Sequence, residues 1–324
     1  MKILITGGAG FLGQRLAHEL LKTQQKQIVT ELVLADIAPL HDAVLLADRR
    51  VRSVTGDLRQ LLDGGVLNGV EGVFHLAAAV SGECEADMDV GLRANLDTTR
   101  ALLDTCRTLT PRPRLVFSSS LAVYGGAMPD VIADNTLPMP QNSYGTQKFI
   151  CEQLIADYTR KGFIDGRSVR LPTVTVRPGK PNKAASGFMS GIIREPLAGV
   201  EAICPVDPST GVWITSPRYA VAGLIAAYAT PREKWGSRIA CNLPGLSVRV
   251  ADMISALQRR AGAPVAARVR VQKDESISTI VGGWPWRFDT VRAQGLGLSG
   301  PQSMDDVVAE YIADYPQACQ PTNP

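Results

Sequence analysis

The sequence predicts an α/β protein in which a doubly wound, parallel sheet is joined to a smaller C-terminal lobe. Two observations support this fold class. In the first half of the chain, short apolar runs alternate with helical patterns, an order typical of parallel strands joined by crossover helices. After about residue 177, proline and glycine interrupt every long element, which indicates loops and short helices. With 324 residues, 45% of them hydrophobic, the chain is long enough for a full α/β core and a second lobe.

The sheet is expected to begin at the N-terminus. Lys2–Thr6 has the pattern of a first strand, and Leu12, Leu16 and Leu20 then recur every four residues, as on one face of a helix. Further strands are predicted at Glu31–Asp36, Val51–Thr55, Gly72–Leu76, Arg114–Ser118 and Val169–Val176. Long helical patterns run from about Ala86 to Arg107 and from about Asn142 to Lys161. Later segments that could rejoin the sheet are a predicted helix at Val212–Thr230 and a predicted strand at Arg238–Leu243.

Composition and charge exclude several classes of protein. The net charge is only +3, from 34 basic and 31 acidic residues, and no basic run could follow a phosphate backbone, so no nucleic-acid partner is expected. No segment has the roughly 18 apolar residues of a membrane span, and the N-terminus lacks the pattern of a secretory signal. The six cysteines are scattered without a C-x-x-C pair, which favours reduced thiols in the cytoplasm and no metal site.

A glycine-rich turn follows the first predicted strand. Gly7, Gly10 and Gly13 have G-x-x-G-x-x-G spacing between this strand and the next helix. Gly7 permits the tight turn, Gly10 lets a pyrophosphate approach the backbone, and Gly13 lets the helix pack close to the strand. The positive end of the helix then faces the phosphates, with Phe11 and Leu12 as further cofactor contacts. The turn predicts a Rossmann-type dinucleotide site, with a plain glycine-rich turn as the alternative.

Asp36 ends the second predicted strand, about where an acidic residue reaches the adenosine ribose in such sites. A carboxylate there repels the additional phosphate of NADP, so NAD is the predicted cofactor. Asp57 and Leu58, after the third strand, are further candidates for the adenine end of the site. A turn-forming role for Asp57 is nearly as strong an interpretation.

Tyr144 and Lys148 form the predicted catalytic pair. They lie four residues apart in a helical pattern, so both side chains emerge on one face. A free phenol has a pKa of about 10 and is a poor base at neutral pH. A nearby ammonium and a positive nicotinamide favour the phenolate, which can then take a hydroxyl proton. The serine run within Phe117–Gly125 precedes them, at a predicted strand end where open α/β sheets bind ligands.

Taken together, these motifs resemble the extended branch of the short-chain dehydrogenase/reductase superfamily, which also contains nucleotide-sugar epimerases and dehydratases. The resemblance covers nearly the whole chain. It is carried by the glycine turn, Asp36, Gly56-Asp57-Leu58, His75-Leu76-Ala77-Ala78, Asn95, the serine run, Tyr144 with Lys148, and Arg177-Pro178-Gly179.

The resemblance implies a role for each serine and for the cofactor contacts. Ser120 would be the active serine, while Ser118 and Ser119 would line the nicotinamide and the substrate. Lys148 would also bind the nicotinamide ribose. The remaining cofactor contacts implied by the resemblance are Leu76, Ala77 and Ala78 beside the cofactor, Asn95 in support, and Pro178 near the carboxamide. The alternatives are a helix-capping serine for Ser120 and a buried amide for Asn95.

Three further expectations follow. His75 is interpreted as a hydrogen-bonded strand residue, because Tyr144 already fills the role of base. Proteins of this family commonly pair through their two long helices, so the resemblance implies a homodimer. The chain is expected to divide into an NAD-binding domain, residues 1–177 plus about 212–245, and a substrate-binding lobe, about 178–211 plus 246–324.

The substrate lobe departs from the nucleotide-sugar pattern at Gly179–Phe188 and at Trp213–Val221. These features, with the loop Ala77–Asp97, resemble the D-erythronate dehydrogenase family, whose members oxidise the C2 hydroxyl of a four-carbon sugar acid with NAD. A small carboxylate needs a guanidinium or ammonium in a partly desolvated pocket. Arg218 is the first candidate, and the other candidates in the lobe are Arg194, Lys180 and Lys183 for the carboxylate, with Asn182, Ser81 and Glu83 for hydroxyls.

Other functions remain open on the same scaffold. A nucleotide-sugar epimerase or a uronate dehydrogenase would use the same Tyr-Lys pair. A non-catalytic NAD-binding regulatory protein would keep the fold, but such a protein normally loses Tyr or Lys from the pair, and this chain has both.

Overall fold

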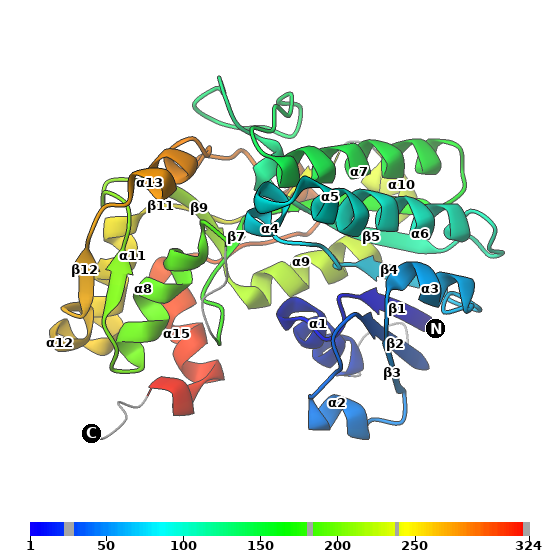
Figure 1. Cartoon of the computed structure of the whole chain (residues 1–324), viewed down its shortest axis with the longest axis horizontal. Coiled ribbons are helices and arrows are strands. Elements are labelled where there is room, and N and C mark those ends of the chain that lie inside the picture. The colour runs from blue at the N-terminus through cyan, green and yellow to red at the C-terminus, as the bar shows by residue number, and fades with distance from the viewer. Residues whose placement is uncertain (23–28, 180–183, 237–239, 320–324) are drawn as a thin grey trace.

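The computed structural model describes residues 1–22, 29–179, 184–236 and 240–319, and a seven-stranded sheet forms its centre (Figure 1). The strand order is β10-β6-β5-β4-β1-β2-β3, and all neighbouring strands are parallel. The order reverses between β1 and β4, so the carboxyl ends of these strands flank the switch point where such sheets bind ligands. The strands are β1 (Lys2–Thr6), β2 (Glu31–Asp36), β3 (Val51–Thr55), β4 (Gly72–His75), β5 (Arg114–Ser120), β6 (Asp165–Leu171) and β10 (Cys241–Asn242).

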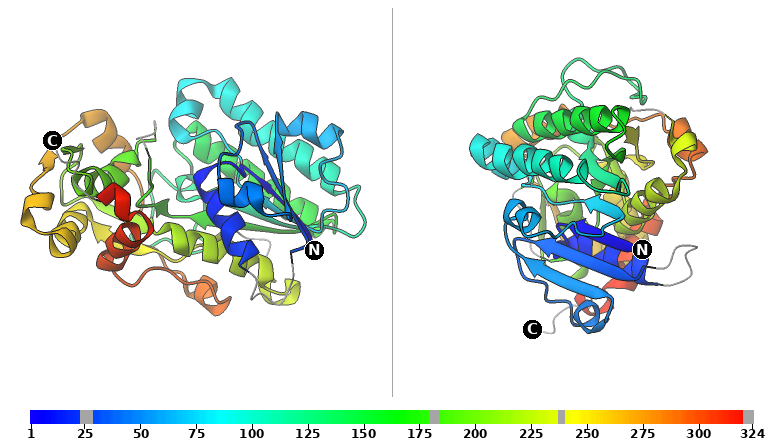
Figure 2. Two further views of the ribbon diagram at one scale, coloured as in Figure 1. Left: turned by 90° about the horizontal axis from the view of Figure 1, so that it is seen from below. Right: turned by 90° about the vertical axis from the view of Figure 1, so that its right-hand side faces the viewer.

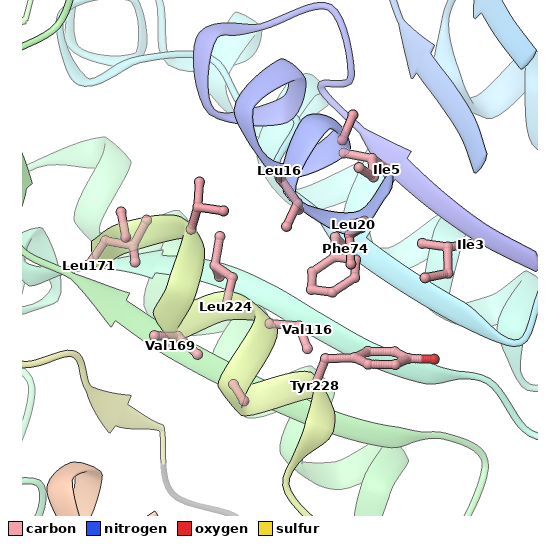
Figure 3. Close-up of a cluster of buried hydrophobic side chains, with 14 of the residues drawn as sticks. Ile3, Ile5, Leu16, Leu20, Phe74, Val116, Val169, Leu171, Leu224 and Tyr228 are labelled. Carbon is pink, nitrogen blue, oxygen red and sulfur yellow. The ribbon is translucent and has the colours of Figure 1, made fainter. Parts of the chain in front are cut away.

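Helices cover both faces of the sheet, because successive strand residues point to opposite sides. On one face, α1 and α9 pack over Ile3, Ile5 and Phe74 (Figure 3). On the other face, α3, α6 and α7 pack over Leu4 and Val73. The helices around the sheet are α1 (Phe11–Leu21), α2 (Ala43–Ala47), α3 (Leu58–Asp63), α6 (Thr98–Cys106), α7 (Ser143–Arg160), α9 (Pro217–Ala229) and α10 (Arg232–Trp235). This arrangement confirms the predicted doubly wound fold.

A second apolar core lies at one end of the sheet, among the C-terminal helices (Figure 2). Two small sheets belong to this region, one with the order β11-β9-β7 and one that pairs β12 with β8. Their strands are β7 (Thr173–Val174), β8 (Ala202–Cys204), β9 (Gly211–Thr215), β11 (Leu246–Arg249) and β12 (Val269–Val271). The helices are α8 (Gly187–Leu197), α11 (Val250–Ala261), α12 (Ala263–Ala266), α13 (Glu275–Gly282), α14 (Val291–Gly295), α15 (Met304–Asp314) and the short turn η3 (Pro316–Cys319).

Two elements predicted as single units each form two different elements in the structure. The strand expected at Val169–Val176 divides at Pro172, so that β6 stays in the main sheet and β7 enters the small one. The helix expected at Val212–Thr230 was wrong at its start, because residues 211–215 form β9. Ser216 caps α9 and Pro217 is its first residue, a common helix start. The strand expected at Arg238–Leu243 does rejoin the main sheet as β10, although residues 238 and 239 lie outside the described ranges.

The long helix expected at about Ala86–Arg107 was also wrong as a single element. The segment forms α4 (Ser81–Ala86), α5 (Met88–Gly91), a π-helical turn η1 (Leu92–Asp97) and then α6. Asp87 separates the first two, because its side chain accepts a 3.0 Å hydrogen bond from the Val90 amide and so caps α5. The apolar spacing predicted the helical character correctly but gave no sign of these interruptions.

None of the helices in the described ranges is long and apolar enough to cross a membrane. All six cysteines fall within the described ranges as free thiols, and five of them are buried.

Candidate active site

The glycine turn joins β1 to α1 through backbone that leaves no room for a side chain at Gly7 or Gly13. Gly7 has φ +71°, in the region that favours glycine, and a Cβ on it would lie 2.9 Å from the Ala77 amide nitrogen. A Cβ on Gly13 would overlap the Gly7 carbonyl oxygen. The first turn of α1, with Phe11 and Leu12, is therefore held close to the end of β1. This is the geometry that the predicted phosphate site requires.

Asp36 lies beside this turn. Its Oδ2 accepts a 3.0 Å hydrogen bond from the Ala9 amide, within the turn, and its Oδ1 accepts one of 3.0 Å from the Ala38 amide. Each carboxylate oxygen keeps a second lone pair, which can accept a ribose hydroxyl. Asp36 therefore lies beside the glycine turn, and its contact with the adenosine ribose stays a prediction.

Asp57 has a local structural role. It caps α3 by accepting a 2.8 Å hydrogen bond from the Arg59 amide, and it also pairs with the Arg59 guanidinium. The hydrogen bond from the Arg59 side chain lowers the pKa of Asp57. The turn-forming interpretation is confirmed, whereas contacts of Asp57 and Leu58 with an adenine ring stay predictions.

The segment after β4 is tied to the same turn through Thr6. Leu76 donates from its backbone to the Thr6 carbonyl at 3.1 Å, and the Ala77 amide donates to the Thr6 hydroxyl at 3.2 Å. Asn95 then holds the following loop, because its Oδ1 accepts from the Ala79 amide at 2.8 Å while its Nδ2 donates to Gln147 at 2.8 Å. The buried-amide interpretation of Asn95 is confirmed, and its effect is to fix the loop containing Ala77 and Ala78 against α7.

His75 is a fully hydrogen-bonded strand residue, as predicted. Its Nδ1 lies 2.6 Å from the Thr6 hydroxyl and its Nε2 lies 2.9 Å from the Thr99 hydroxyl. Burial, with a smaller contribution from the charge of Lys148, lowers the pKa of His75 to about 3. The imidazole is therefore neutral at physiological pH and has no free nitrogen with which to serve as an acid or a base.

The three serines at the end of β5 have different environments. The Ser118 hydroxyl donates to the His75 carbonyl at 3.2 Å, and the Ser119 hydroxyl donates to Glu152. Ser119 is only 2% exposed, and the substrate contact predicted for it stays a prediction. Ser120 is half-buried, and its Oγ accepts a 3.1 Å hydrogen bond from the Ala122 amide. It caps the short helical turn η2 (Leu121–Val123), yet its hydroxyl proton remains available to donate to a ligand.

Tyr144 and Lys148 face this strand end from α7. Asn142 caps the helix by accepting a 2.8 Å hydrogen bond from the Gly145 amide. A Cβ on Gly145 would overlap the Ala122 carbonyl oxygen, so the first turn of α7 packs directly against η2. Tyr144 is thereby brought to the same strand end as Ser120. Among the described residues, the Ser120 side chain is hydrogen-bonded to the Ala122 amide and not to Tyr144.

Lys148 connects the helix to the strand. Its Nζ donates a 2.9 Å hydrogen bond to the Ser118 carbonyl and lies 5.6 Å from the centre of the Tyr144 ring. The Lys148 side chain is almost completely buried, and no carboxylate among the described residues forms an ion pair with it. Its positive charge is therefore weakly screened and acts on the neighbouring phenol.

Comparisons with known proteins agree with this geometry. The model of the NAD dependent epimerase/dehydratase family matches residues 3–208. This chain belongs to that family. It is 51% identical to D-erythronate dehydrogenase of Cupriavidus necator, over 97% of this chain and 98% of that protein. It is 45% identical to D-erythronate dehydrogenase of Haemophilus influenzae, over 96% and 99% of the two chains.

A solved structure gives the same result for the fold. The nucleoside-diphosphate-sugar epimerase of Agrobacterium tumefaciens matches with a TM-score of 0.92 and 40% identity, over 98% of this chain and 95% of that one. Membership of the NAD-dependent epimerase/dehydratase family confirms the fold class, the extended short-chain dehydrogenase resemblance and NAD as the cofactor. The glycine turn and Asp36 are the residues of this chain that fit the cofactor.

In this member of the epimerase/dehydratase family, the two arginines predicted to bind the substrate have protein partners. Arg194 is buried, its Nη1 donates to the Arg177 carbonyl at 2.8 Å, and its Nη2 pairs with Glu195. Arg218 is exposed, and its guanidinium lies 3.5 Å from Glu310. The direct carboxylate contacts predicted for Arg194 and Arg218 stay predictions. Lys180, Asn182 and Lys183 lie outside the described residues.

The other predicted hydroxyl ligands begin α4. Ser81 is the first residue of that helix, and Glu83 accepts a 3.0 Å hydrogen bond from the Val80 amide. Pro178 is half-buried and follows Arg177 at the end of the segment that leaves β7. The contacts of Ser81 and Glu83 with the substrate, and of Pro178 with the cofactor, stay predictions.

Sequence reasoning missed three residues that shape the site: Thr6, Glu152 and Arg177. Thr6 holds both His75 and the Ala77 amide. Glu152 holds Ser119, and it lies four residues after Lys148 on the same helix, a spacing that could have indicated it. Arg177 is held by the Ser190 hydroxyl and the Val174 carbonyl. Burial lowers the pKa of Arg177, and the charge of Tyr144 opposes this shift.

Proposed function

We propose that this chain oxidises the C2 hydroxyl of a small sugar acid with NAD, and specifically D-erythronate to 2-oxo-tetronate. The substrate assignment is supported by the two relatives named D-erythronate dehydrogenase, which match nearly the full chain. The observation that carries the chemistry is the contact of Lys148 with the Ser118 carbonyl and the Tyr144 ring. This contact places a buried ammonium beside a phenol at a ligand-binding strand end.

Each side chain then has one task. Tyr144, as phenolate, takes the proton of the C2 hydroxyl, and Ser120 donates a hydrogen bond to the same oxygen. The charge of Lys148 stabilises the phenolate. The glycine turn and Asp36 hold NAD, which supplies the acceptor for the hydride leaving C2. His75 takes no part in proton transfer, because it is buried and neutral.

We also propose that two separate sets of residues bind NAD and the acid. Residues 1–177 with about 212–245 bind NAD, and residues of about 178–211 with 246–324 bind the acid. Strands β7 and β9 fall in the first set, yet they pair within a small sheet of the second region. They would therefore connect the two units.

We also propose a cytoplasmic homodimer that pairs through the α5–α6 segment and α7. Sedimentation that shows only monomer at micromolar concentration would contradict the dimer.

The test is NADH absorbance after mixing the purified protein with NAD and a panel of four- to six-carbon sugar acids. Tyr144→Phe should lower kcat by about 100-fold or more, since a positioned general base contributes about 10²–10⁴. Tyr158→Phe is the matched control, because Tyr158 lies on the same helix but donates its hydroxyl proton to Asp104 of α6. Equal activity of the wild type and Tyr144→Phe would contradict the mechanism.

A second candidate is a nucleotide-sugar epimerase, which the 40% identity to the Agrobacterium tumefaciens protein favours. An epimerase returns the hydride to its substrate and releases no net NADH. If no sugar acid yields NADH and the protein interconverts a nucleotide sugar, the epimerase would therefore be favoured over the dehydrogenase.

A further inference from the structure

Phe117, on β5, presents its ring to the ammonium group of Lys148. The Nζ atom lies 4.6 Å from the centre of this ring, closer than the 5.6 Å that separates it from the centre of the Tyr144 ring. A cation within about 6 Å of a ring centre is attracted by the negative face of the ring, and the attraction grows when water is excluded. Phe117 and Lys148 are both almost completely buried. The two side chains therefore form a cation–π pair in a dry environment.

The ammonium group of Lys148 has few polar partners in the protein. Among the described residues, its one hydrogen bond is the 2.9 Å bond that Nζ donates to the Ser118 carbonyl. All 31 Asp and Glu residues lie within the described ranges, and none forms an ion pair with it. An ammonium group can donate three hydrogen bonds, and a buried charge with unmet donors is costly. The ring face of Phe117 therefore replaces part of the hydration that burial removes.

The other titratable groups described around this ammonium supply no free negative charge at neutral pH. Burial lowers the pKa of His75, on β4, to about 3, so the imidazole is neutral. Burial raises the pKa of the thiols of Cys84, on α4, and Cys151, on α7, so both stay protonated. The Glu152 carboxylate, one turn further along α7, is paired with Arg170. Aromatic ring faces and one carbonyl oxygen therefore compensate the charge.

A row of neighbouring residues fixes the position of the Phe117 ring. Thr6, His75 and Phe117 are direct partners on β1, β4 and β5, so their side chains point to the same face of the sheet. The Thr6 hydroxyl lies 2.6 Å from His75 Nδ1, and the His75 and Phe117 rings stack with centres 5.7 Å apart. The same hydroxyl accepts a hydrogen bond from the Ala77 amide. The row therefore fixes Lys148 relative to the segment that follows β4.

We propose that Phe117 is a positioning residue whose ring face holds Lys148 in its charged form beside Tyr144. The inference rests on the proposed function, in which the charge of Lys148 stabilises the Tyr144 phenolate. A ring with a weaker negative face would make the buried ammonium less stable, so that Lys148 would lose its proton or its position. In both cases the phenolate would be less favoured, and the substrate hydroxyl would lose its proton to Tyr144 only at higher pH.

The experiment changes the ring face and keeps its shape. Phe117 is replaced with phenylalanines that carry one, two or three fluorine atoms on the ring, which progressively weaken the negative potential of the face. In NADH assays with D-erythronate, the midpoint of the acid limb of kcat/KM against pH should rise with each fluorine, by about 0.5–1 pH unit in total. Below that midpoint, kcat/KM should fall by about 3- to 10-fold. A role in packing alone would give no graded shift.

Phe74 provides a matched control on the opposite face of the sheet. It is fully buried on β4 and packs against Tyr228, with ring centres 5.1 Å apart (Figure 3). The same three replacements at Phe74 should leave the midpoint unchanged. Phe117→Leu, which removes the ring face and keeps an apolar side chain, should shift the midpoint at least as far as three fluorines do. An unchanged midpoint in the Phe117 series, or an equal shift in the Phe74 series, would overturn the proposal.

A measurement on the protein without substrate separates this inference from the proposed function. Failure of the proposed function would appear in the wild type, as the absence of NADH from every sugar acid. In that event, nuclear magnetic resonance of protein labelled at the lysine ε-carbon still decides the role of Phe117. The Lys148 signal is the one that disappears in Lys148→Arg.

The pH at which the Lys148 signal changes should be highest in the wild type and should fall with each fluorine on the Phe117 ring, because the ring face favours the charged form. A graded fall would support the proposal even if no sugar acid reacts. The same titration in the wild type and in all three fluorinated proteins would refute it even if the enzyme is active.

Discussion

Glu152 and Arg170 form an ion pair, with Glu152 Oε2 2.7 Å from Arg170 Nη2. Both side chains are almost entirely buried. Burial alone would lower the pKa of Arg170, but the hydrogen bonds and the charge of Glu152 raise it. The same carboxylate accepts from Ser119, and Arg170 also donates to the Tyr124 hydroxyl. The pair therefore joins α7, β5 and β6 at the strand end that carries Ser120.

Glu152→Gln should be strongly destabilising, because it leaves the buried Arg170 charge without a partner. Removal of one partner from such a pair costs about 3–5 kcal/mol. The free energy of unfolding, measured in urea at pH 7, should fall by about this amount. Asp157→Asn, which breaks an exposed pair with Arg160 on the same helix, should change it by less than about 1 kcal/mol. Glu152→Met combined with Arg170→Met should recover part of the loss, and a double variant weaker than Glu152→Gln would contradict the explanation.

Asp36→Ala should weaken NAD binding and admit NADP. The variant removes the carboxylate expected to accept the ribose hydroxyls, and such charged hydrogen bonds contribute about 1.5–3 kcal/mol. The KM for NAD should therefore rise by about 10- to 100-fold, while activity with NADP should increase because the repulsion of its phosphate is lost. Asp63→Asn, an exposed position on α3, serves as the control. An unchanged ratio of NAD to NADP activity would place the ribose contact elsewhere.

Two glycine variants should separate cofactor binding from folding. Alanine at Gly13 would overlap the Gly7 carbonyl, whereas alanine at Gly10 would meet only that oxygen, at 3.1 Å. Gly13→Ala should therefore lower the melting temperature and abolish NAD binding. Gly10→Ala should melt close to wild type but bind NAD more weakly, because its methyl group occupies the approach of the pyrophosphate. Normal NAD affinity in Gly10→Ala, measured by titration, would place the phosphates elsewhere.

The sequence predicted the first strands of the main sheet well, because β1 and β2 are compact apolar runs that end at a turn. β1, β2 and β3 have the predicted bounds. Because the strands are parallel, their carboxyl ends meet at one edge, so Gly7, Asp36 and Ser120 could be assigned to one site before their contacts were known.

The failures have physical causes that a single sequence does not reveal. β7 leaves the main sheet, and residues 211–215 form β9 instead of a helix, because these two segments pair with each other although some 40 residues separate them. The partner of Arg218 likewise depends on how α15 packs against the start of α9. A cationic side chain in a predicted lobe is therefore only a candidate ligand until its ion pairs are known.

The neutral state of His75 should make the protein less stable in acid. The folded pKa is about 3, because of burial and then the charge of Lys148, whereas an unfolded histidine titrates near 6.5. Between these values the unfolded chain binds a proton that the folded chain does not. The stability contribution is therefore complete above about pH 6.5 and is lost as the pH falls towards 3, by about 1.4 kcal/mol for each pH unit.

His75→Gln should reduce this acid sensitivity, because the amide does not titrate and can still hydrogen-bond to Thr6 and Thr99. Urea unfolding at pH 7, 6 and 5 should show a smaller loss of stability for the variant, by about 1–2 kcal/mol over this range. Its stability at pH 7 will also fall, since the amide fills the imidazole site imperfectly, so the slope is the informative quantity. His41→Gln, at an exposed position, should keep the wild-type slope. Parallel curves for wild type and His75→Gln would mean that other groups cause the acid sensitivity, and that the buried imidazole is not its source.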